Sequence, residues 1–309
     1  MSAAPCGRGL RRRRFWLGAL WLGALWLAGA WLATARAAPV AVRDDRGVEL
    51  RLTAPPRRIV TMLPSLTETV WVLGAGARLV GVDRYSNWPA AVAQLPHLGG
   101  LDDAQIEAIA ALRPDVILAS TSSRAMDRLQ ALGFAVVRLK SETHADVRRT
   151  LAVVAALLGT PERGQQVWAG IERQLDAAAA RVPPALRGQS VYFEIGGGPY
   201  AAGTSSFIGQ TLARLGLVNI VPAALGPFPK LNPEFVVRAR PDLIIGLRRD
   251  MSTLAERPGW GALAAVRERR LCGFDSDDYD MLVRSGPRLG EAAVLLADCL
   301  GRLAAPAAR

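Results

Sequence analysis

The phrase IEAIAALRPDVI at residues 106–117 returns later in the chain as PEFVVRARPDLI at residues 233–244. Both copies place a glutamate at the second position, Arg-Pro-Asp at the same offset, and an apolar run after it. Because the residue before a proline is driven out of the helical region, each copy predicts a helix that stops at Arg113 or Arg240 and then a short buried strand. The chain therefore contains the same helix-to-strand unit twice.

The wider pattern around the two copies also repeats. Apolar runs at 58–62 and 190–195 each read as a strand leading through a loop into a helix, and similar endings follow, LGAGARLVGV at 73–82 and LARLGLVNIV at 212–221. Strand, helix, short strand, helix and strand thus follow one another in both halves. Such alternation predicts an α/β fold of two similar lobes, each with a mostly parallel sheet flanked by helices.

A single long helix is predicted between the lobes. It begins at Pro161 after the Thr160 cap, carries an apolar stripe, and ends at Val182 before two prolines. A helix of this length spans about 33 Å and restricts the relative motion of the lobes that it joins. The predicted organisation is an N-terminal extension at 38–56, a first lobe at 57–141, a connecting segment at 142–187 with the backbone helix at 161–182, a second lobe at 188–303 and a tail at 304–309.

Residues 1–37 have the three-part pattern of a secretory signal. Four arginines at 11–14 precede a charge-free apolar stretch at 15–35, and Ala35-Arg36-Ala37 supplies small residues around a cleavage point. An uncleaved membrane anchor is the alternative, since the apolar stretch is long enough to span a bilayer. The rest of the chain has 32 basic and 27 acidic residues, a net charge of +5 instead of +11. No basic stripe or motif indicates nucleic-acid binding.

Residues for catalysis are scarce. The chain has two histidines, His97 and His144, and no phosphate-binding loop or nucleophile elbow. The run from Ser65 to Glu68 is interpreted as a capping box. In such a box the Ser65 side chain caps a helix, and the Glu68 side chain, three residues later, accepts a hydrogen bond from the Ser65 backbone amide. No catalytic residue, metal site or cofactor is predicted, and an exported α/β enzyme is the less favoured hypothesis.

Two cysteines follow the signal, Cys272 and Cys299. In an exported chain an even number permits one disulfide, while two separate buried thiols would pack equally well as small apolar side chains. Both alternatives stay open at this point.

Candidate ligand-binding residues lie in the loops at the carboxyl ends of the predicted strands, where parallel sheets hold their ligands. Aromatic side chains recur in these loops in both lobes, which suits a sizeable organic ligand. The candidates are Tyr85, Trp88, Tyr200, Phe228, Tyr279 and Arg248.

The chain resembles the periplasmic substrate-binding proteins of ABC importers for cobalamin and iron chelates, the class III group with a helical backbone between the lobes. The resemblance runs from about residue 57 to 303 and rests on RIVTMLPSLTE, LVGVDRYSNWP, IEAIAALRPDVIL, PYAAG and NPEFVVRARPDLII. It implies a periplasmic monomer without enzymatic activity, which captures a metal chelate between its lobes and delivers it to the permease dimer of an ABC importer.

The resemblance also implies roles for single residues. Tyr85 would help to cover a corrin ring, Tyr200 and Phe228 occupy comparable loops, and Glu107 and Glu234 would each meet one subunit of the permease dimer. Cobalamin is the favoured chelate, although LGGLDD at 98–103 lacks the tryptophan of some cobalamin binders. A ferric siderophore or haem is the alternative, since arginines near the predicted cleft suit an anionic ligand. These arginines are Arg84, Arg124, Arg248 and Arg249.

Overall fold

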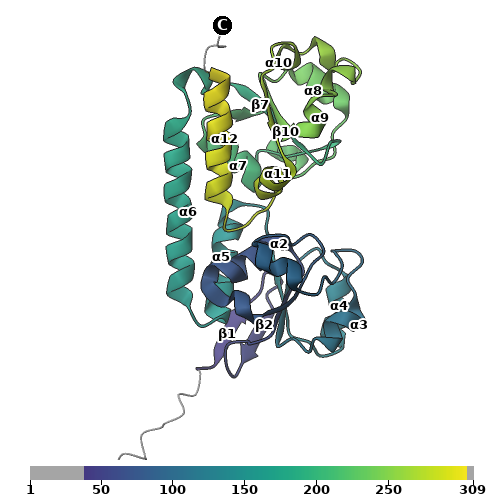
Figure 1. Cartoon of the computed structure of the whole chain (residues 1–309), viewed down its shortest axis with the longest axis vertical. Helices are drawn as coiled ribbons and strands as arrows, with labels where there is room; N and C mark the ends of the chain where they lie inside the picture. The colour runs from purple at the N-terminus through teal and green to yellow at the C-terminus, as the bar shows by residue number, and fades with distance from the viewer. Residues whose placement is uncertain (1–37, 305–309) are drawn as a thin grey trace, which may run out of the picture. The chain divides into compact units, whose positions relative to one another are not determined.

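The computed structural model describes residues 38–304, so the predicted signal at 1–37 and the last five residues lie outside it. Within this part of the chain, no helix is both long and apolar enough to cross a membrane. The described residues form one compact unit. It is built on two mostly parallel sheets, and this confirms the predicted α/β fold (Figure 1).

The first sheet contains four strands, all parallel. Its strands are short and buried because helices pack on both faces, which explains their unbroken apolar sequences. In spatial order they are β4 (Leu79–Val82), β3 (Ile59–Thr61), β5 (Val116–Ser120) and β6 (Val136–Leu139). The helices among them are α2 (Pro64–Val70), α3 (Ile106–Ala111) and α4 (Ala125–Ala131). We call this sheet with its helices and loops the first lobe.

A short antiparallel hairpin precedes the first lobe. It consists of β1 (Val40–Arg43) and β2 (Glu49–Leu52). The Asp45 carboxylate between the two strands accepts hydrogen bonds from the Arg149 guanidinium at 2.6 and 2.8 Å. The hairpin is thereby fastened to the helix α5 (His144–Leu157).

The second sheet contains five strands, of which only the short β8 is antiparallel to its neighbour. Its strands are β11 (Leu271–Phe274), β10 (Leu243–Leu247), β7 (Ser190–Ile195) and β8 (Tyr200–Ala201), with β9 (Val218–Asn219) also paired to β7. Its helices are α7 (Phe207–Arg214), α8 (Pro233–Ala239), α9 (Arg248–Met251), α10 (Ala264–Arg267) and α11 (Ser276–Leu282). We call this sheet with its helices and loops the second lobe.

The repeated sequence phrase folds in the same way in both lobes. Helix α3 leads through Arg113 into β5, and α8 leads through Arg240 into β10. Both arginines adopt the left-handed conformation, with φ of 45° and 47°. This conformation ends each helix and avoids the steric conflict between a helical residue and the proline that follows it. The predicted helix-to-strand unit is therefore confirmed twice.

Neither of the two helix caps predicted from the sequence is formed, although α8 has a side-chain cap. The Asn232 side chain caps α8 by accepting a hydrogen bond from the Glu234 amide at 3.0 Å. The capping box at Ser65 is wrong, because α2 begins at Pro64 after Leu63 and has no side-chain cap. Thr160 likewise makes no capping hydrogen bond. Tertiary contacts of Ser65 and Glu68, described below, take the place of the local pattern.

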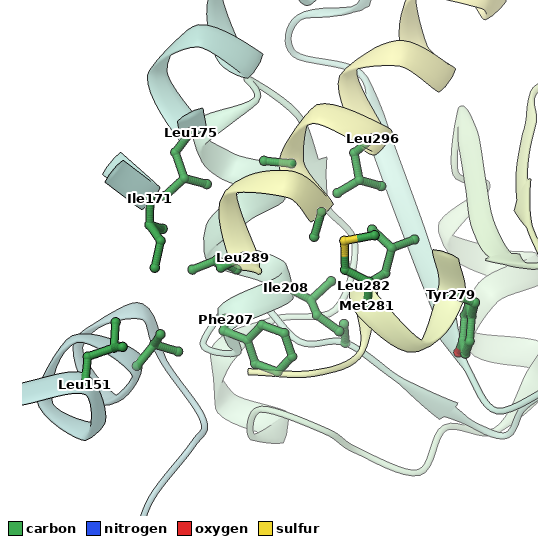
Figure 2. Close-up of a cluster of buried hydrophobic side chains, with 14 of the residues drawn as sticks. Leu151, Ile171, Leu175, Phe207, Ile208, Tyr279, Met281, Leu282, Leu289 and Leu296 are labelled. Carbon is green, nitrogen blue, oxygen red and sulfur yellow. The ribbon is translucent and has the colours of Figure 1, made fainter. Parts of the chain in front are cut away.

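Two long helices, α6 (Pro161–Arg181) and α12 (Leu289–Ala304), run side by side along one side of the two sheets (Figure 1). Helix α6 ends one residue before the predicted boundary, because Val182 turns to an extended conformation ahead of Pro183. Figure 2 shows Ile171 and Leu175 of α6 beside Leu289 of α12, in a cluster of buried side chains that reaches both sheets.

A disulfide connects Cys272 in β11 to Cys299 in α12 and decides between the two alternatives for these cysteines. Replacing both cysteines by serine is expected to lower the free energy of unfolding by about 3–4 kcal/mol, because the bond closes a loop with a sequence separation of 27 residues. Urea unfolding of the oxidised wild type and the variant measures the difference. A loss below about 1 kcal/mol would show that the bond adds little to stability.

Candidate functional site

A pocket of about 800 Å³ lies between loops of the two lobes. Its walls come from the residues that follow β3, β4 and β6 in the first lobe, and from the end of β7, the loop before α8 and the end of α11 in the second. The carboxyl ends of parallel strands thus supply much of the lining, as predicted for a ligand site in such a fold. The lining residues are Leu63, Pro64, Ser65, Arg84, Tyr85, Asn87, Ser141, Ile195, Tyr200, Phe207, Phe228, Asp280, Val283, Arg284 and Ser285.

Three of the predicted aromatic residues line this pocket together. Tyr85 comes from the first lobe, and Tyr200 and Phe228 come from the second. The two tyrosines remain 62% and 49% exposed, which is unusual for large side chains in a concave site and typical of a surface that a ligand covers. Phe228 packs edge-on against Phe207, another lining residue, with ring centroids 5.9 Å apart.

The other three predicted ligand residues lie outside the pocket. The Trp88 ring lies under the Arg288 guanidinium, and the Arg288 Cζ is 4.7 Å from the centroid of this ring. Arg248 points to solvent and forms an ion pair with Asp275 at 2.8 Å. Trp88 lies in the segment after β4, whereas Arg248 is the first residue of α9, and in both cases a charged neighbour outside the pocket holds the side chain.

Tyr279 is the third of these residues, and it is buried in the wall of the second lobe. Its hydroxyl donates to the Glu194 carbonyl at 2.9 Å and accepts from the Gly196 amide at 2.8 Å. Burial raises the pKa of Tyr279 to about 12. These bonds hold the end of β7, next to the pocket residue Ile195, so Tyr279 supports the wall without touching the cavity.

Arg284 is a pocket residue that sequence reasoning missed. It follows α11 and reaches across to the first lobe, where its guanidinium donates to Glu68 Oε1 at 3.0 Å, to Asn87 Oδ1 at 2.7 Å and to the Tyr85 carbonyl at 3.1 Å. It also donates to Asp280 Oδ2 at 2.7 Å, one helical turn earlier. The four-residue spacing of Asp280 and Arg284 was the one local signal available for this group. We call these five residues the interlobe clasp.

Glu68 is the buried member of the interlobe clasp, with a side chain 1% exposed. Burial raises the pKa of its carboxyl above the usual range, while the hydrogen bond and charge of Arg284 act in the opposite direction. A buried carboxylate is stable only with a partner, so the position of Glu68 depends on Arg284 of the other lobe.

A chain of buried hydroxyls shapes the loop that carries Tyr85. Asp83 accepts from the Tyr85 amide at 2.8 Å and from Ser86 Oγ at 2.5 Å, and Ser86 Oγ lies 2.7 Å from Thr67 Oγ1. Burial raises the pKa of the Asp83 carboxyl, and the hydrogen bonds from Ser86 and Tyr85 oppose this effect. The loop after β4 is therefore fixed by groups inside the first lobe as well as by Arg284.

The two arginines that line the pocket, Arg84 and Arg284, are paired with carboxylates. Arg84 forms an ion pair with Asp103, and the Asp103 carboxylate also accepts a hydrogen bond from the Gly100 amide. Arg284 is held by Glu68 and Asp280. Among the described residues, Arg84 and Arg284 are the pocket-lining cations, so the lining carries little net positive charge.

The two repeated glutamates lie in equivalent positions. Glu107 is in the first turn of α3, is 81% exposed and lies 3.5 Å from Arg128. Glu234 is in the first turn of α8 and is exposed as well. Both carboxylates are therefore available at a surface of their own lobe.

No group of three or more His, Cys, Asp or Glu side chains that could hold a metal ion occurs in residues 38–304. The pocket itself offers mainly apolar side chains, a few hydroxyls and amides, and paired charges. Such a lining binds an organic molecule by contact and hydrogen bonding.

Comparison with known proteins agrees with this geometry. A vitamin B12-binding protein of Salmonella typhimurium is 26% identical over 265 residues, covering 83% of this chain and 96% of that protein. An uncharacterized ABC transporter substrate-binding lipoprotein of Bacillus subtilis is 25% identical over 275 residues, 85% of each chain. The crystal structure of a periplasmic heme-binding protein from Pseudomonas aeruginosa aligns with a TM-score of 0.71 and 26% identity over 82% of this chain and 95% of that one.

The family match covers more than half of the chain and both lobes. Such proteins bind small solutes without enzymatic activity and work with a permease, and an extracytoplasmic location fits the relatives. The resemblance stated from the sequence motifs is thereby confirmed. Residues 59–277 match the model described as periplasmic binding protein, and the chain belongs to that family.

Proposed function

We propose that this protein captures cobalamin or a related corrinoid in the pocket between its lobes and delivers it to the permease of an ABC importer. In this proposal residues 1–37 act as a signal peptide, and the remaining chain works as a monomer in the periplasm. Tyr85, Tyr200 and Phe228 contact the corrin ring, and the vitamin B12-binding relative supports this ligand class.

The ion pairs of the two pocket arginines favour cobalamin over haem and ferric siderophores. Cyanocobalamin has no net charge and its corrin ring is rimmed by amides, whereas haem carries propionate carboxylates and ferric tris-catecholates are anionic. An anionic ligand needs free cations, and here Arg84 and Arg284 already face Asp103, Glu68 and Asp280. A polyamide ligand needs only hydrogen-bonding groups, which Ser65, Asn87, Ser141 and Ser285 supply.

Haem is the second candidate. The similarity to the heme-binding protein of Pseudomonas aeruginosa favours it, and so does the apolar lining. The Arg84–Asp103 ion pair distinguishes the two ligands. Only haem, through its propionate carboxylates, would bind more tightly if the Arg84 guanidinium were free.

Replacing Asp103 by asparagine tests this distinction. Asparagine keeps an oxygen acceptor for the Gly100 amide but releases Arg84 from its ion pair. Affinity for haem is expected to rise several-fold, as for a partly exposed charge, and affinity for cyanocobalamin to change less than about twofold. Absorption titrations of the wild type and Asp103→Asn with each ligand measure this. Tighter binding of haem than of cyanocobalamin by the wild type would contradict the corrinoid assignment.

Glu107 and Glu234 are proposed to dock the loaded protein on the permease. They occupy the same place in the two repeated units, one in each lobe, and both are exposed. Two equivalent carboxylates suit a partner made of two equivalent subunits, since a two-fold symmetric surface presents each contact twice.

A further inference from the structure

We propose that Arg284 is a positioning residue of the ligand pocket: from the second lobe it fixes the Tyr85–Asn87 segment of the first lobe, so that Tyr85 stands ready to receive the ligand. The inference rests on the proposed function, since it assigns ligand contact to Tyr85. It adds a determinant of binding that lies 199 residues away from Tyr85 in the sequence.

Arg284 holds the Tyr85–Asn87 segment at both ends. One terminal nitrogen, Nη2, donates to the Tyr85 carbonyl at 3.1 Å, and the other, Nη1, donates to Asn87 Oδ1 at 2.7 Å. The Asn87 amide in turn donates to Asp280 Oδ2 at 3.2 Å. A guanidinium presents these donors in a rigid planar fork, so it fixes the direction of its acceptors as well as their distance.

The guanidinium is itself held firmly. Its side chain is 10% exposed and lies between the carboxylates of Glu68 and Asp280, at 3.0 and 2.7 Å. The chain next to Arg284 packs closely on α2. Gly286 lies so near this helix that a Cβ added to it would be 3.2 Å from the Cβ of Ser65. Arg284 is therefore a stable support and not a mobile surface side chain.

Tyr85 needs such support because the residue is 62% exposed and gains little from packing in the free protein. Its backbone is fixed on one side by Asp83, within the first lobe, and on the other side by Arg284. Fixing the segment before the ligand arrives removes part of the entropy lost on binding. Tyr85 is thereby positioned by both lobes at once.

A double-mutant cycle tests the role of Arg284 with cyanocobalamin as the probe. Arg284→Gln is expected to weaken binding about tenfold in the wild-type background, but less than about twofold when Tyr85 is already alanine, because Arg284 acts through Tyr85. Arg214→Gln is the matched control, since Arg214 pairs with Asp176 outside the pocket and its loss should leave affinity unchanged. Equal losses in both backgrounds would overturn the proposal and leave Arg284 with a purely structural role.

Hydrogen exchange of the ligand-free protein provides a second readout that does not depend on the ligand. Amides of residues 85–87 are expected to exchange at least about tenfold faster in Arg284→Gln, while those of β3 and β5 stay unchanged. Unchanged exchange at 85–87 would also overturn the proposal. If Arg284→Gln does not fold, Asp280→Asn takes its place, since it keeps the Arg284–Glu68 pair and weakens only the support of Asn87 and Arg284. Failure of the wild type to bind cyanocobalamin would count against the proposed function alone, because exchange still decides the role of Arg284.

Discussion

Replacing Tyr85, Tyr200 and Phe228 together by alanine is expected to lower the affinity for cyanocobalamin at least about a thousandfold. Each replacement removes apolar contact of about 2 kcal/mol with the ligand, or tens of fold in affinity, and the three side chains line one pocket from both lobes. The tyrosines are largely exposed, so their loss should leave the fold intact. Titration of the variant by absorption measures the effect.

A matched control separates the pocket from the rest of the surface. Leu132 and Val218 are 60% and 56% exposed and lie outside the pocket, so alanine at both should leave affinity within about twofold of the wild type. Thermal unfolding of both variants shows whether the fold is preserved. Wild-type affinity in the triple alanine variant would place the ligand somewhere else.

Reversing the charges of Glu107 and Glu234 to arginine is expected to abolish transport of cobalamin and leave its binding unchanged. Both carboxylates are exposed and neither belongs to the pocket lining, so the fold and the ligand site should tolerate the change. Charge pairs between proteins set orientation and association rate, and reversal turns attraction into repulsion at both contacts. Transport into vesicles that contain the permease, measured beside the affinity for cyanocobalamin, tests the prediction.

The control for this experiment carries the same change of charge elsewhere. Glu172 and Glu268 are exposed glutamates in α6 and after α10, and arginine at both should leave transport near the wild-type rate. Normal transport with Glu107→Arg and Glu234→Arg would mean that the two carboxylates serve only the helix N-termini, where they contribute about 0.3–1 kcal/mol each.

The architecture was predictable because it depends on local signals. Arg-Pro-Asp after an amphipathic run ends a helix whatever surrounds it, and apolar runs of β-branched residues form buried strands in both lobes. Asn232 followed by Pro233 likewise starts a helix by itself. The positions of Tyr85, Tyr200 and Phe228 followed from the rule that parallel strands gather their loops at one edge.

The interlobe clasp could not be predicted because its strongest partners are far apart in the sequence. Glu68 and Arg284 are separated by 216 residues. The local pattern from Ser65 to Glu68 favoured a capping box, worth about 1 kcal/mol, but a buried carboxylate beside a guanidinium outweighs it. Tyr279 was misplaced for a related reason, since α11 turns it inward to stack on Phe193 with ring centroids 6.3 Å apart.

Native mass spectrometry of residues 38–309 in an equimolar mixture of cyanocobalamin, haem and a ferric tris-catecholate tests the central claim most directly. The paired arginines and the aromatic walls of the pocket predict a one-to-one complex with cyanocobalamin that excludes the two anionic chelates. A complex with haem or the siderophore alone, or no complex with any of the three, would contradict the assignment of this protein as a corrinoid receptor.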